Sequence, residues 1–206
     1  MEELGTNDTK VLVYHHLRTM SKIIQDEFPE TKILAWFDEF KNQDASVIQD
    51  FELDKRITPV VWKYWSSNLA GALPEAMWAN LSQAFPTAWG ASAFKGANGA
   101  AQIDNAIVPY LSNNQLWRDQ IDMHSDKFND SIPAVIVTGW QRYDHFTGLC
   151  ELLPTSMTAL ALSMAMVENG NVTDDDAASI AAILSCPKST TIVNLIAGND
   201  TCKYTG

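Results

Sequence analysis

Short apolar runs alternate with longer amphipathic stretches along the chain. β-Prone runs at residues 32–35, 58–61, 87–88 and 132–138 predict four buried strands, each leading into a Trp. Apolar residues at helical spacing predict helices at residues 9–28, 74–83, 102–123, 154–169 and 173–185, with only weak periodicity at 42–51. The predicted order is therefore one helix followed by four strand–helix units.

Local sequence signals mark several helix boundaries. Asn7 or Asp8 is suited to cap the first helix, and Thr173 begins a Thr-Asp-Asp-Asp cap. Gly170 follows the last apolar position of its helix and is expected to end it. Pro109 lies inside the 102–123 pattern, where we expect it to kink the helix.

Strands that alternate with helices pair in parallel through right-handed crossovers. A complete (β/α)8 barrel usually needs about 250 residues, whereas the four strand–helix units take up the 206 residues of this chain. We therefore predict an α/β fold in which residues 1–206 form a single partial domain, half of a (β/α)8 TIM barrel. Two open strand edges would remain, and self-association through these edges is expected.

Composition limits the classes of partner and the cellular compartment that we expect for the chain. A hydrophobic content of 46% fits a globular chain, and a net charge of −11 with a pI near 4.6 argues against nucleic acid or an anionic membrane as partner. No apolar run is long enough to span a bilayer, and the N-terminus shows no signal peptide. The three cysteines lack metal-ligand spacing, which fits a reducing compartment. We expect a cytoplasmic or nuclear chain.

A tryptophan stands at or near the end of each expected strand: Trp36, Trp62, Trp89 and Trp140. A flat, weakly polar wall suits the C–H face of a sugar ring, and neighbouring polar groups can bond its hydroxyls. A single Trp is more often part of a core, and scattered core tryptophans are the alternative. Four in equivalent positions favour one shared pocket.

The densest group of polar side chains follows the last strand. Gln141, Arg142 and Asp144 come directly after Trp140. The carboxyl ends of parallel strands are where α/β folds bind ligands. The alternative is that Trp140 plugs the top of the barrel while Arg142 and Asp144 form a structural ion pair.

Two long motifs carry a family resemblance. Residues 85–97 (FPTAWGASAFKGA) and 137–146 (VTGWQRYDHF), the second followed by LCELLP, closely resemble β-N-acetylhexosaminidases of glycoside hydrolase family 20. Residues 57–62 with Tyr64, and residues 33–36 with Asp38, look like the preceding strands of that family. The resemblance implies a barrel whose fifth to eighth strands are the four predicted here.

The resemblance also implies a mechanism without metal or other cofactor. In family 20 the acetamido oxygen of the substrate attacks the anomeric carbon, an Asp orients the acetamide, and the adjacent Glu protonates the leaving oxygen. No position of this chain matches that Asp-Glu pair, so we expect no catalytic residue in it. Asp38-Glu39 lies at a strand end, but neighbouring strand residues point to opposite faces, which argues against its replacing the pair.

By resemblance, the four tryptophans surround a terminal N-acetylhexosamine, Tyr64 bonds its acetamide, and Asp144 accepts from its hydroxyls, with Gln141 and Arg142 in the same segment. Lys95 is either a hydroxyl donor or a counter-charge to Asp144. Asp38 completes the expected substrate-binding set.

We predict the first of the following three functions, and the other two are alternatives to it. The first is a β-N-acetylhexosaminidase that acts on glycans or glycoconjugates ending in β-linked GlcNAc or GalNAc. The second is a non-catalytic sugar-binding protein or pseudo-enzyme. The third is a sugar-phosphate barrel enzyme that uses Lys95 and the glycines that follow it.

Overall fold

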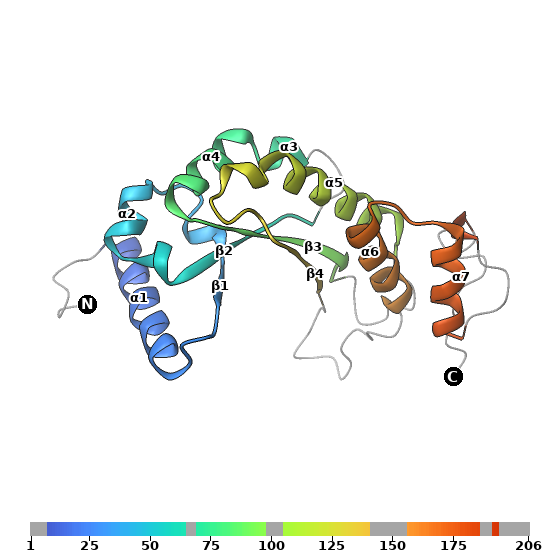
Figure 1. The fold of residues 1–206 in the computed structure, drawn as a ribbon, viewed down its shortest axis with the longest axis horizontal. Coiled ribbons are helices and arrows are strands. Elements are labelled where there is room, and N and C mark those ends of the chain that lie inside the picture. Colours follow the sequence, from blue (N-terminus) through green and yellow to red (C-terminus); the bar gives the residue numbers. More distant parts are fainter. Residues whose placement is uncertain (1–7, 65–68, 98–104, 141–155, 186–190, 194–206) are drawn as a thin grey trace. The chain divides into compact units, whose positions relative to one another are not determined.

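A computed structural model describes residues 8–64, 69–97, 105–140, 156–185 and 191–193 (Figure 1). The strands are β1 (Ile33–Trp36), β2 (Ile57–Trp62), β3 (Trp89–Lys95) and β4 (Val135–Gly139). The helices are α1 (Thr9–Glu27), α2 (Ala45–Asp50), α3 (Leu69–Ala72), α4 (Glu75–Ala84), α5 (Val108–His124), α6 (Met157–Asn169) and α7 (Asp174–Ile183). Single turns of 3-10 helix form η2 (Phe37–Glu39), η3 (Leu53–Lys55) and η4 (Ser125–Lys127).

The four strands join one sheet in chain order, β1-β2-β3-β4. β1 and β2 are parallel, with Trp36 opposite Val60. β3 and β4 run the same way, because the backbone N–H of Gly90 donates to Ala134 O and that of Trp140 donates to Lys95 O. Strands that neighbour each other in chain order are typical of a barrel, whereas doubly wound sheets reverse their order. The α/β prediction is confirmed, and the topology is compatible with half a barrel.

The described residues belong to two compact units. Unit 1 consists of Met1–Trp62, Ala70–Gly90 and Met123–Ala134, and unit 2 of Lys63–Leu69, Ala91–Asp122 and Val135–Gly206. β3 begins in unit 1 and continues in unit 2.

In unit 1, α1 packs through Tyr14, whose side chain is buried among aromatic rings. Its ring lies 6.2 Å from that of Phe40 and 5.7 Å from that of Phe51, measured between centroids. The Tyr14 hydroxyl donates to Glu39 O at 2.6 Å. Burial, with a smaller contribution from the Glu39 charge, raises the pKa of Tyr14 to about 12. The phenol therefore stays protonated and ties α1 to the turn that follows β1.

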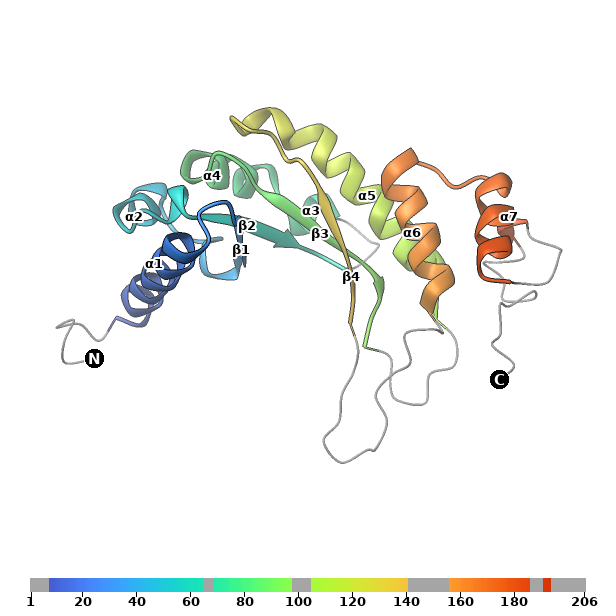
Figure 2. The ribbon, with the colours of Figure 1, turned by 60° about the horizontal axis from the view of Figure 1, so that its bottom comes forward.

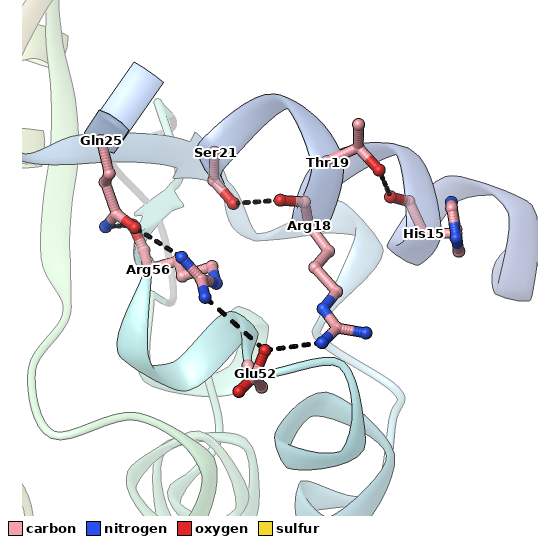
Figure 3. A network of polar contacts seen from close by, with 7 residues as sticks. All are labelled: His15, Arg18, Thr19, Ser21, Gln25, Glu52 and Arg56. Carbon is pink, nitrogen blue, oxygen red and sulfur yellow. Dashed lines mark hydrogen bonds and ion pairs between the residues drawn. The ribbon is translucent and has the colours of Figure 1, made fainter. Parts of the chain in front are cut away.

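A polar network fixes α1 to the turn before β2 (Figure 3). The side chain of Glu52 accepts from Arg18 at 2.8 Å and lies 3.5 Å from Arg56. The Arg56 guanidinium in turn donates to Gln25 Oε1 at 2.8 Å. The Arg18 hydrogen bond and charge are the main cause of a lowered pKa at Glu52. Because these groups are partly exposed, the network orients α1 more than it stabilises it.

In unit 2, α6 lies beside α5 and α7 (Figure 2). The apolar cluster that these helices share contains Leu111 of α5, Leu162 of α6 and Ile180 of α7. The local caps form as the sequence predicts. Gly170 ends α6 in the left-handed region at φ 79°, and Thr173 forms a capping box with Asp176 at the start of α7. Among the described helices, none combines the length and the apolar character needed to cross a membrane.

Two expectations are wrong. The third strand does not end at Trp89 but begins there and runs to Lys95, because Gly90 to Ala93 take part in the sheet despite their low intrinsic preference for strands. Pro109 does not kink a helix. It stands in the first turn of α5, where the missing N–H of proline has no intrahelical partner to lose.

Candidate functional site

The carboxyl ends of β1 and β2 carry an indole held by a carboxylate in unit 1. Trp62 closes β2, and its Nε1 donates to Asp38 Oδ2 at 2.6 Å. The second carboxylate oxygen of Asp38 lies 3.6 Å from Lys41 Nζ. A charge-assisted hydrogen bond of this length fixes the plane of the indole ring. Trp36, the last residue of β1, is 44% exposed.

Asp38 and Glu39 closely follow β1 and make different contacts. Both lie in the single turn η2 rather than on a strand. Asp38 is engaged with the Trp62 indole, and the backbone oxygen of Glu39 accepts from the Tyr14 hydroxyl. The hydrogen bond with Asp38 sets the orientation of the Trp62 indole.

In unit 2, the residues that follow β2 and β4 form an aromatic pair. The rings of Tyr64 and Trp140 lie 5.5 Å apart between centroids, tilted by 54°. Trp140 keeps 40% of its surface exposed, although its backbone N–H is bonded to Lys95 O at 3.0 Å. An exposed indole on a fixed backbone is a suitable platform for a flat ligand face.

Lys95, at the carboxyl end of β3, is buried and holds the backbone of this region. Its Nζ donates to Gly96 O at 2.9 Å and to Trp140 O at 3.2 Å. Burial lowers the pKa of the Lys95 ammonium. These contacts hold the carboxyl ends of β3 and β4 together.

Gly139 lets β3 and β4 approach closely just before Trp140. A Cβ atom at this position would lie 2.3 Å from Cζ of Phe94, well inside van der Waals contact. The ring of Phe94 is buried, so it has little room to move. Packing therefore requires glycine at position 139.

The sequence interpretation missed two residues of α5. Asn113 and Trp117 are fully buried, and their side-chain N–H groups donate to Lys63 O at 3.1 Å and 2.9 Å. They hold the residue that joins β2 to Tyr64. Asparagine at helical spacing gives no local signal for such a contact.

The structure brings the predicted residues together in part. Asp38 contacts Trp62 in unit 1, and Tyr64, Lys95 and Trp140 meet in unit 2. Trp89 begins β3 in unit 1, six residues before Lys95 in the sequence. Gln141, Arg142 and Asp144 lie outside the described residues.

No protein-family model matches the chain. Among curated proteins, it is similar to hexosaminidase D of Homo sapiens, at 29% identity over 178 residues, which cover 86% of this chain and 36% of the human protein. It is also similar to hexosaminidase D of Bos taurus, at 28% identity over 169 residues, 82% of this chain and 48% of the bovine protein. The resemblance to hexosaminidases is thus confirmed, and the chain spans less than half the length of these relatives.

Proposed function

We propose that this chain forms the sugar-binding half of a β-N-acetylhexosaminidase of glycoside hydrolase family 20, with β1 to β4 corresponding to the fifth to eighth strands of its barrel. The observation that carries the proposal is the pair of Tyr64 and Trp140, which meet at 5.5 Å beyond two different strands. The similarity to two hexosaminidases supports the substrate class.

In this proposal each polar or aromatic group has a distinct task. The exposed face of Trp140 stacks on the sugar ring, and the Tyr64 hydroxyl bonds the acetamide. Within unit 1 Asp38 orients the Trp62 indole, and within unit 2 Lys95 keeps the Trp140 backbone in place. The segment after Trp140 supplies partners for the sugar hydroxyls through Gln141, Arg142 and Asp144. The substrate is a terminal, non-reducing β-linked GlcNAc or GalNAc.

The chemistry proposed for the complete site is substrate-assisted retention. The acetamido oxygen forms a bond to the anomeric carbon as the bond to the leaving oxygen breaks, and a Glu protonates that oxygen. Residues outside this chain supply the Asp-Glu pair. The engagement of Asp38 with an indole supports this division, in which the residues of this chain serve binding.

A calorimetric titration of the chain with three ligands tests the proposal. N-acetylglucosamine should bind, whereas glucose, which lacks the acetamide, should bind at least about tenfold more weakly because the hydrogen bond between Tyr64 and the acetamide is then lost. Inorganic phosphate should give no heat of binding. Binding of phosphate without binding of N-acetylglucosamine would replace the proposal with the sugar-phosphate alternative.

Turnover of an aryl N-acetylglucosaminide tests the division of labour. We expect none from this chain, since loss of a positioned proton donor alone costs about a hundredfold to ten-thousandfold in rate. Turnover that disappears in Asp38→Asn or Glu39→Gln would contradict the assignment and make these carboxylates catalytic.

A further inference from the structure

The hydrogen-bond ladder between β2 and β3 is interrupted at its carboxyl end, within unit 2. In a parallel pair, a residue whose N–H donates to one residue of the neighbouring strand accepts through its C=O from the residue two positions further on. Lys63 N donates to Ala91 O at 3.2 Å, so the next bond of the ladder would run from Ala93 N to Lys63 O. That bond is replaced by a side chain.

The carboxamide of Asn113 occupies the place of this bond. Ala93 N donates to Asn113 Oδ1 at 3.3 Å, and Asn113 Nδ2 donates to Lys63 O at 3.1 Å. One side chain thus presents the acceptor and the donor that the two strands would otherwise present to each other. Its insertion separates the two backbones while leaving both polar groups satisfied.

The bonded carbonyl belongs to the peptide group that carries Tyr64. Lys63 O is fixed by two donors from α5, Asn113 Nδ2 and, at 2.9 Å, Trp117 Nε1. Because a peptide group is planar, the direction of this carbonyl sets the direction in which the chain continues into Tyr64. The Tyr64 ring then meets Trp140, which follows β4 rather than the adjacent β3.

We propose that Asn113 is a positioning residue for the sugar site: its carboxamide separates Lys63, the residue after β2, from Ala93 of β3 so that Tyr64 stands against Trp140. The inference rests on the proposed function for the identity of the ligand. The separation of the strands itself is independent of that identity.

Asn114 provides a matched control on the same helix. It is as fully buried as Asn113 and makes comparable bonds, accepting from the Ser92 hydroxyl and donating to Ala93 O and Tyr110 O. None of these bonds reaches Lys63. A purely structural role for a buried asparagine would therefore affect the two variants alike.

Fluorine NMR of chain labelled with 5-fluorotryptophan reports the position of Tyr64. Trp140→Phe assigns the Trp140 signal, and Tyr64→Leu gives its shift without the neighbouring ring. In Asn113→Ala the strands can pair directly, so the Trp140 signal should move at least about half of the way to the Tyr64→Leu value, and the Kd for N-acetylglucosamine should rise about fivefold. Asn114→Ala should leave both unchanged.

Asn113→Asp is the second variant, since it keeps the acceptor for Ala93 N but sets a carboxylate oxygen against Lys63 O. It should shift the Trp140 signal in the same direction. Equal shifts in the Asn113 and Asn114 variants, or no shift in either Asn113 variant, would overturn the role of Asn113. Absence of N-acetylglucosamine binding in the unmodified chain would instead overturn the proposed function, while the fluorine shifts would still decide the positioning role.

Discussion

Replacing Asp38 tests whether its carboxylate holds the Trp62 indole in place. Its carboxylate accepts from the Trp62 indole at 2.6 Å. A hydrogen bond to a charged group contributes about 1.5–3 kcal/mol and a neutral one about 0.5–1.5 kcal/mol. Since the Asp38 side chain is 39% exposed, the low end of each range applies. Asp38→Asn keeps an acceptor and should destabilise the fold by about 0.5–1 kcal/mol, and Asp38→Leu by about 1.5–2 kcal/mol.

Urea unfolding followed by tryptophan fluorescence measures the free energy of unfolding of both variants. If the slope of this free energy against urea concentration is the same in each variant, the free energies can be compared. Lys41→Met is the control: Lys41 lies 3.6 Å from the same carboxylate on the surface, and its loss should cost less than about 0.5 kcal/mol. Equal free energies of unfolding for Asp38→Asn, Asp38→Leu and the unmodified chain would refute the reasoning, because the indole bond would then contribute nothing.

Two further substitutions test packing and titration. Gly139→Ala should destabilise the chain by about 1–3 kcal/mol, because its Cβ would lie 2.3 Å from Phe94 Cζ; an unchanged melting temperature would contradict this contact. His124 is buried and stacks on Trp78 at 5.4 Å, and its burial lowers its pKa from 6.5 more than the nearby Glu75 raises it. As the pH falls below 6.5, the His124 imidazole binds a proton in the unfolded chain before it does so in the folded chain. The unmodified chain should therefore lose more stability between about pH 7 and 5.5 than His124→Phe does. Parallel profiles of stability against pH for the two proteins would count against a lowered pKa.

The sequence predicts those parts of the fold that are set by local chemistry. Asp8, Gly170 and Thr173 were expected to cap helices and do so, because a cap depends on residues within one turn. The start of β3 at Trp89 was missed, since Gly, Ala and Ser give little intrinsic signal for a strand and pairing with both neighbours decides their conformation.

In the candidate site, too, features set by local sequence are predictable, and features set by contacts between distant residues are not. The ends of the second and fourth strands are predictable, so the positions of Trp62 and Trp140 follow from the order of elements. Asn113 could not be found in this way, because its partner Lys63 lies 50 residues away in the sequence and the contact depends on how α5 packs on the sheet. Side chains that replace a backbone hydrogen bond leave no periodic trace.

The binding of N-acetylglucosamine to Trp140→Ala tests the central claim most directly. Stacking of an indole on a sugar face contributes about 1 kcal/mol or more, so the substitution should weaken binding at least about fivefold in a calorimetric titration. Trp89→Ala is the control, since Trp89 begins β3 at the amino end of the strand, and it should change the Kd by less than about twofold. Equal losses of affinity in the two folded variants would contradict a sugar site at the carboxyl ends of these strands.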